Sequence, residues 1–283
     1  MSVLHKITTV KNIVKTRGYF GVFIVIISKL SNRLLLSLAL EFDEIMLVYS
    51  LYKKNAGLKK QKSNFMFDVG ARFGSSFEPF AKDDWRIYAF EPDSSNRKIL
   101  INNFSHLNNV SIDKRALSNN NVKNVEFYSS DISTGISSLT NFHPSHIQSE
   151  MVDTITLESF CKENQIQTID FLKIDTEGYD YFVLKGVPWQ YIKPTIIVCE
   201  FENNKTIPLG YTFHDIAKYL LKHGYKVIVS EWYPIIKYGG PHKWREFKEY
   251  PCEMVDDNGW GNLIASRDRT EYQKLLTLCR DFK

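Results

Sequence analysis

Residues 65 to 91 hold the glycines and acids whose spacing is most suggestive of chemistry. The stretch FMFDVGARFG passes from an apolar run to Asp68 and then places Gly70 and Gly74 close together. Glycine allows backbone angles that other residues avoid, and it lets another group come close. Glu91 follows the next apolar run, 21 positions after Gly70. A carboxylate at that place can accept hydrogen bonds from both hydroxyls of a ribose, so the spacing predicts a nucleoside-like ligand.

The glycine turn also bears on which nucleoside binds. The dinucleotide fingerprint GxGxxG needs a second glycine to make room for a pyrophosphate. Arg72 stands at that position, which argues against an NAD-linked enzyme. The spacing DxGxxxG from Asp68 to Gly74 instead resembles the first motif of Rossmann-like methyltransferases that use S-adenosylmethionine, a ligand with a ribose and no phosphate.

Five segments, in order, are similar to the motifs of the FkbM family of methyltransferases. They are Asp68 to Gly74, Phe90 to Pro92, Ala116 to Ser118, Lys173 to Asp180, and Glu200. The resemblance covers about residues 65 to 266. It departs at Arg72 and Phe73, where the family more often has Asn and a small or aliphatic residue, and at Asp180, where Glu is commoner.

The resemblance implies a class I Rossmann-like α/β fold, with a mostly parallel seven-stranded sheet and helices on both faces. It implies S-adenosylmethionine as cofactor and acceptors that include polyketides and sugars. Carried onto this sequence, the expected cofactor-binding residues are Asp68, Gly70, Ala71, Arg72, Gly74, Glu91, Pro92, Ala116 and Asp175.

Asp175 and Glu177 are the candidates for catalytic residues, because they end the fourth strand and open its helix. Methyl transfer needs donor and acceptor to be aligned, water to be excluded and a proton to leave the acceptor. We assign Asp175 to positioning cofactor or acceptor and Glu177 to the base, with helix capping as the alternative for both. Lys173 is expected to be an ion-pair partner of Asp68 or Glu91.

A second group of acids ends the fifth strand. Glu200 and Glu202 point to the same side of an extended chain and could join Asp175 in a cluster that holds Mg²⁺. The alternative, which we favour, is a set of separately solvated carboxylates with no metal. His143 and His146, in a predicted long polar loop, and His214 and His242 are other candidates for a base. The aromatic stretch 231–250 suits either a sugar or sheet-edge packing.

Alternating strands and helices must position these residues. Apolar runs predict strands at 65–69, 86–90, 110–117, 169–175, 194–201, 225–232 and 261–266, with a short extra strand at NVEFYS. Helical patterns fall between them, including 75–82, 94–104 and 157–164, the last with Thr156 as cap. This alternation is typical of a parallel sheet covered on both faces.

The first 60 residues differ from the rest. They carry several lysines before apolar runs that are too short to span a membrane. We expect a helical segment at 1–60, either packed on the main domain or making peripheral contact with a membrane surface, and a methyltransferase domain at 61–283. The charged break at 53–64 marks the boundary.

The composition limits the classes of partner that we expect for the protein. A net charge of +4 over 283 residues is too small to indicate nucleic acid, and the segment Asp175 to Gly178 lacks the Pro-Pro-aromatic motif of nucleic-acid N-methyltransferases. Four cysteines without zinc-site spacing fit a reducing cytoplasm. The leading hypothesis is O-methylation of a saccharide or other small molecule, as in glycan biosynthesis. The alternatives are an N-methyltransferase and a weak or inactive cofactor-binding module that acts as an interaction partner.

Overall fold

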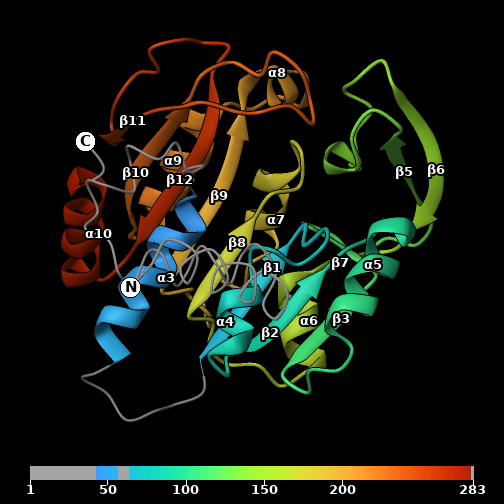
Figure 1. Ribbon diagram of the computed structural model, residues 1–283, viewed down its shortest axis with the longest axis horizontal. Helices are drawn as coiled ribbons and strands as arrows, with labels where there is room; N and C mark the ends of the chain where they lie inside the picture. Colours follow the sequence, from blue (N-terminus) through green and yellow to red (C-terminus); the bar gives the residue numbers. More distant parts are fainter. Residues whose placement is uncertain (1–42, 57–63, 282–283) are drawn as a thin grey trace, which may run out of the picture. The chain divides into compact units, whose positions relative to one another are not determined.

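An eight-stranded sheet is the central element of the described residues, and most of the predicted motifs lie where its parallel strands end (Figure 1). The computed structural model describes residues 43–56 and 64–281. In the order β3-β2-β1-β8-β9-β12-β10-β11, the strands are Val110–Asp113, Arg86–Phe90, Phe65–Val69, Phe171–Ile174, Ile196–Glu202, Trp260–Ser266, Lys226–Trp232 and Trp244–Glu249. The first five are parallel to one another, β12 is antiparallel to β9 and β10, and β11 is antiparallel to β10.

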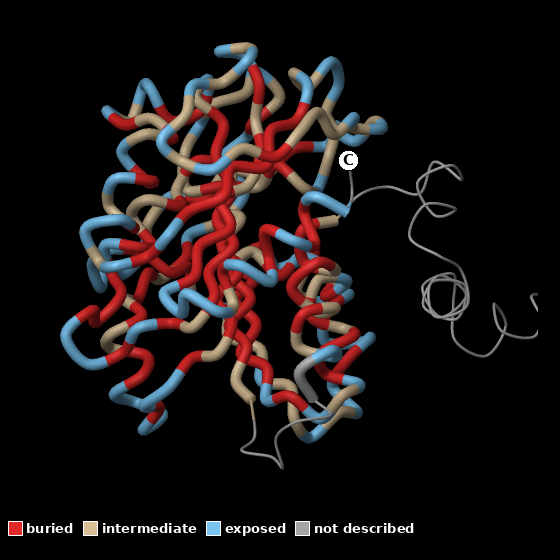
Figure 2. The backbone as a smooth tube through the Cα atoms, turned by 90° about the vertical axis from the view of Figure 1, so that its left-hand side faces the viewer, coloured by how far each residue is buried: buried red, intermediate tan, exposed pale blue. Residues whose placement is uncertain are grey.

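The central strands are mostly apolar because both faces of the sheet are covered. Every residue of β9 is buried, and so are the last four of β1. Figure 2 shows these buried stretches running through the middle of the molecule. The predicted Rossmann-like α/β class is confirmed by this topology.

Alternate residues of β1 face different helices. Phe67 and Val69 lie in one cluster with side chains of α6 (Leu157–Glu163), α7 (Asp180–Lys185) and α9 (Phe213–Lys222). The opposite face packs on α4 (Glu78–Lys82), where Phe80 contacts Phe171 with ring centroids 5.4 Å apart. Helix α5 (Ser94–Phe104) joins that layer through a contact between Phe104 and Phe77.

The sheet has one strand more than the predicted seven. Strand β11 lies within the aromatic stretch that the sequence left open, and it pairs with β10 as an edge strand. Arg245 and Lys248 on β11 each lie 2.9 Å from Glu231, whose side chain is fully buried in β10. Pairing with these two cations compensates the burial of the Glu231 charge, and this holds the extra strand in place.

Two other sequence predictions are corrected near β3. The strand predicted at 110–117 is divided into β3 and β4 (Ala116–Ser118), because the carboxylate of Asp113 accepts from the backbone N–H of Arg115 and turns the chain. Strand β4 pairs with β7 (Thr154–Thr156). The loop predicted around His146 is shorter than expected, since β6 (His146–Val152) begins there and pairs with β5 (Val125–Ser130).

Helix α3 (Glu44–Ala56) belongs to the compact unit that contains the sheet. The hydroxyl of Tyr49 donates to Asp83 at 2.7 Å, that of Tyr52 to the carbonyl of Asp170 at 2.8 Å, and Trp232 Nε1 to Glu44 at 2.7 Å. Residues 1–42 and 57–63 of the predicted N-terminal segment lie outside the described residues, so the boundary at 60/61 stays a prediction. Within the described ranges, none of the helices has the length and apolar character to cross a bilayer.

Candidate active site

The strand order reverses between β1 and β8, and the predicted site residues lie at the carboxyl ends of these strands, where such sheets bind ligands. After β1 the N–H groups of Gly70 and Ala71 both donate to the carbonyl of Phe90 at 3.1 Å. Gly70 has φ +80°, and a Cβ there would overlap the carbonyl oxygen of Asp175. Only glycine fits, because the turns after β1 and β8 lie directly against each other.

Glu91 stands at the end of β2, next to this turn. Its side chain is buried, with the residue 4% exposed, and its two oxygens accept from the N–H of Arg72 at 2.6 Å and of Asp93 at 2.9 Å. Burial raises the pKa of Glu91 to about 7, although both backbone N–H groups lower it. Each oxygen keeps a lone pair for a further donor, so the residue fits the predicted ribose-binding role.

Asp68 forms a buried ion pair below the turn. Lys173 Nζ lies 3.1 Å from Asp68 and 3.4 Å from Asp175, and it donates to the carbonyl of Gly70 at 2.7 Å. Burial lowers the pKa of Lys173, but Asp68 and Asp175 outweigh it and the pKa is raised. The predicted pairing with Asp68 is confirmed, and Asp175 takes the place proposed for Glu91. The lysine therefore ties the ends of β1 and β8 together.

Arg72 and Gly74, two further residues of the first motif, have structural roles in the fold. Arg72 adopts φ +48°, and its guanidinium donates to Thr134 at 3.1 Å, so its side chain lies against the β5–β6 loop. A Cβ on Gly74 would overlap the ring of Phe104, so this glycine allows α5 to pack closely. Their predicted cofactor contacts, like those of Ala71, Pro92 and Ala116, stay predictions.

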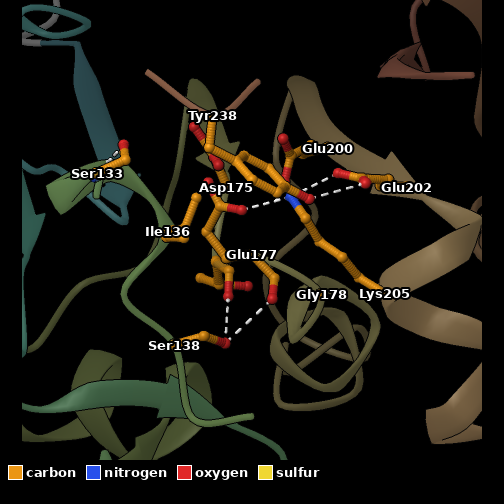
Figure 3. Close-up of polar contacts among 12 residues, drawn as sticks. Ser133, Ile136, Ser138, Asp175, Glu177, Gly178, Glu200, Glu202, Lys205 and Tyr238 are labelled. Carbon is orange, nitrogen blue, oxygen red and sulfur yellow. Dashed lines mark hydrogen bonds and ion pairs between the residues drawn. The ribbon is translucent and has the colours of Figure 1, made fainter. Parts of the chain in front are cut away.

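A tightly bonded turn, residues 175–179, presents Glu177 (Figure 3). The Asp180 carboxylate accepts from the N–H groups of Thr176 at 3.0 Å and Gly178 at 3.1 Å. Ser138 Oγ donates to the carbonyls of Thr176 at 3.2 Å and Glu177 at 3.1 Å. Asp180 is thus the carboxylate that holds this turn, not Asp175 or Glu177 as the capping alternative supposed.

Lys205, in the short helix α8 (Asn203–Thr206), pairs with the acids beside this turn. Its Nζ donates to Glu177 and lies 2.7 Å from Glu202 and 3.9 Å from Glu200. Carboxylate oxygens of Asp175, Glu177 and Glu200 all lie within 4.8 Å of one another. The structure thus brings Glu177 into the acidic cluster predicted from Asp175, Glu200 and Glu202, and it places an ammonium group against that cluster.

The environment of Glu177 gives it the properties of a base. Burial raises its pKa to about 7, Lys205 opposes this, and Asp175 and Glu202 add to it. A carboxylate that titrates near neutrality is better matched to proton removal than an ordinary solvated one. The sequence gives no local signal for this environment, because it is built by residues from distant segments.

The histidines lie around the site rather than at its centre. His143 packs against Tyr238 with ring centroids 5.2 Å apart, and a ring nitrogen of His146 lies 2.8 Å from the carbonyl of Ile136. His214 pairs with Glu253 at 3.2 Å on the surface, and His242 packs against Trp260. These contacts favour structural roles for all four.

Comparison with known protein families shows to which family the chain belongs. A model of the methyltransferase FkbM domain matches residues 68–227, which is more than half of the chain. The chain belongs to the FkbM methyltransferase family. It is an S-adenosylmethionine-dependent methyltransferase, as predicted from its five motifs. The Gly70 turn and the fixed carboxylate of Glu91 fit that cofactor.

Other comparisons are more distant. No curated protein sequence matches the chain significantly. Solved structures similar to this FkbM methyltransferase include a precorrin-6Y C5,15-methyltransferase from Geobacter metallireducens, with 14% identity and a TM-score of 0.39 over 76% of this chain and 86% of that one. An S-adenosylmethionine-dependent O-methyltransferase from Thermotoga maritima has 12% identity and a TM-score of 0.34 over 78% of this chain and 66% of that one.

Sequence reasoning gave no role to Lys205 or Ser138. Tyr238 lies in the aromatic stretch 231–250, which the sequence left open between sugar binding and sheet-edge packing. A signal existed for Lys205, because it follows Glu202 by three residues, the spacing of a helical ion pair.

Proposed function

We propose that this FkbM methyltransferase methylates a hydroxyl group of a saccharide or other small-molecule acceptor and that Glu177 is the base. The observation that carries the proposal is the position of Glu177: a largely buried carboxylate, with its side chain 14% exposed and a pKa of about 7, in the turn after β8 that lies against the turn of Gly70. A hydroxyl loses its proton only as the new bond forms, so a base of this kind lowers the barrier.

Each remaining group has a role in this reaction. S-adenosylmethionine, when bound, supplies an electrophilic methyl group on a sulfonium. Glu91 binds the ribose hydroxyls, and the Asp68–Lys173 pair fixes the floor beneath the methionine end. Asp175, whose side chain is 41% exposed, pairs with Lys173 through one carboxylate oxygen and orients the acceptor hydroxyl with the other. Phe142 and Tyr238 lie over Lys205 at 5.2 Å and 5.4 Å and exclude water from the acids.

A product-release assay tests the proposal. The purified protein is incubated with S-adenosylmethionine and a panel of glycans, small alcohols, phenols and amines, and S-adenosylhomocysteine is measured. We expect release with hydroxyl acceptors and a loss of about 100-fold or more in kcat for Glu177→Gln, with unchanged affinity for S-adenosylhomocysteine. Glu253→Gln is the matched control, since that side chain is 87% exposed. Turnover with amines alone, or full activity of Glu177→Gln, contradicts the proposal.

The cellular setting forms a second part of the proposal. The basic and apolar character of residues 1–60 supports work at the cytoplasmic face of a membrane, where glycan intermediates are assembled. Flotation of the full chain with anionic liposomes tests it. We expect salt-sensitive binding. Absence of binding to anionic vesicles at low salt contradicts this part and leaves the chemistry untouched.

A further inference from the structure

Lys205 places a buried ammonium group among the acids of the site, and the proposed reaction gives it no chemical step. Lys205 is 3% exposed, although lysine is rarely buried unless it is paired. Glu177 accepts a hydrogen bond from it, and Glu202 and Glu200 lie 2.7 Å and 3.9 Å away. Burial lowers the pKa of Lys205, but Glu177 and Glu200 outweigh it and the pKa is raised, so the group is a cation at neutral pH.

Two loops from distant parts of the sequence close over this ammonium. Phe142 comes from the β5–β6 loop and Tyr238 from the β10–β11 loop, and both rings lie over Nζ. The hydroxyl of Tyr238 donates to Glu202 at 3.1 Å. A Cβ on Gly239 would lie 3.7 Å from Oγ of Ser133, so the two loops meet at this point. Figure 3 shows the ring of Tyr238 beside the nitrogen end of Lys205, with the acids around them.

The carboxylates around Lys205 indicate the role of its ammonium group. Three carboxylates converge on one cation, and the nearby Asp175 pairs with Lys173 instead. A divalent ion is the usual means of holding several carboxylate oxygens together. Here a side chain supplies the positive charge, and its contacts with Glu177 and Glu202 leave those oxygens already paired.

We infer that Lys205 is a positioning residue that acts as a built-in cation: it holds the base Glu177 in place and occupies the position that a divalent metal would otherwise take among these acids. The inference rests on the proposed role of Glu177. It predicts that methyl transfer is indifferent to Mg²⁺ and to chelators. It also predicts that the protonation of Glu177 responds to the charge at position 205.

Several titratable and charged groups face Glu177, and the direction of each effect follows from its charge. Removing the ammonium leaves Glu177 beside other acids, so its carboxylate should hold a proton to higher pH. Removing the charge of Glu202 has the opposite effect, because a like charge is lost and the ammonium is shared among fewer acids. Asp175, Glu200, Glu202, Lys205 and Tyr238 face Glu177 itself, Asp180 and His146 face Lys205, and His143 packs against Tyr238.

The test follows the carboxyl group directly, so it does not depend on knowing the acceptor. Protein labelled with ¹³C at the glutamate carboxyl is titrated by NMR, and Glu177→Gln identifies the resonance of Glu177. We expect the titration midpoint of Glu177 to rise by about one pH unit or more in Lys205→Met and to fall in Glu202→Gln. Partial return toward the wild-type midpoint is expected in Lys205→Arg. Addition of millimolar MgCl₂ or EDTA to the wild type should leave the midpoint unchanged.

Binding of S-adenosylhomocysteine by calorimetry shows whether each variant is folded. An unshifted midpoint in a folded Lys205→Met protein overturns the inference. If Lys205→Met does not fold, Glu202→Gln decides, and an unshifted midpoint there overturns it. A wild-type midpoint that moves with MgCl₂ also overturns it. If no hydroxyl is ever methylated, the proposed function fails, and the NMR result still decides whether Lys205 controls Glu177.

Discussion

Replacement of Glu91 by Gln should weaken binding of the cofactor, because Glu91 is the residue assigned to the ribose hydroxyls. The carboxylate is held by the N–H groups of Arg72 and Asp93, and it has lone pairs left for two ribose hydroxyls. Hydrogen bonds to a charged group contribute about 1.5–3 kcal/mol each, against about 1 kcal/mol for neutral partners. An amide retains one carbonyl oxygen and loses the charge, so about 3 kcal/mol is lost, which corresponds to about 100-fold in the Kd for S-adenosylhomocysteine.

Isothermal titration calorimetry measures this Kd in the wild type and in Glu91→Gln. Glu44→Gln is the matched control: Glu44 is also 4% exposed and also has a pKa raised by burial to about 7, but it lies on α3 and bonds to Trp232. We expect wild-type affinity in the control. Affinity within about threefold of wild type in a folded Glu91→Gln protein would refute the ribose assignment.

The raised pKa of Glu91 adds a pH signature to the same experiment. Protonation removes the acceptor charge, so the affinity of the wild type should fall by up to about tenfold for each pH unit below about 7. Glu91→Gln cannot titrate and should show a flatter dependence. Parallel pH profiles for the two proteins would contradict the reasoning.

The remaining predictions concern stability. Gly70→Ala should lower the free energy of unfolding in urea by about 3 kcal/mol or more, because the new Cβ meets the carbonyl of Asp175. Gly210→Ala is the control, with φ +84° and open space around it, and should lower the free energy of unfolding by only about 1 kcal/mol. Equal losses would refute the close approach of the two turns. Burial raises the pKa of Glu44 from 4.5 to about 7, so its ionisation opposes folding as pH rises through that range. The stability of Glu44→Gln relative to wild type should therefore improve by up to about 3 kcal/mol between pH 4.5 and 8 in chemical unfolding, and a pH-independent difference would refute it.

The parts of the fold that follow from local pattern were predictable. Strands β1 and β2 and helix α5 were placed at their observed bounds, since apolar runs and helical spacing specify them without reference to distant residues. Thr156 caps α6 as expected, with its hydroxyl accepting from the N–H of Ser159 at 3.0 Å. The turn at Gly70 could be located because two glycines closely follow the apolar run of the first strand.

The parts that depend on distant contacts were not predictable. Strand β11 forms because Glu231 is buried in β10 and needs cations from the next strand. The surroundings of Glu177, the proposed base, come from separate segments: Lys205 pairs with it, and the rings of Phe142 and Tyr238 lie over the ammonium of Lys205. No residue pattern near position 177 encodes these partners, so the sequence could place Glu177 at the end of a strand but could not predict its surroundings.

Co-crystallisation with S-adenosylhomocysteine tests the central claim most directly. The account predicts that the ribose hydroxyls bind Glu91, that the amino-acid tail lies along the turn after β1, and that the sulfur faces Glu177. A ligand bound with its ribose away from the end of β2, or with its sulfur turned away from the acids beside Lys205, contradicts the assignment of this edge of the sheet as the place of methyl transfer.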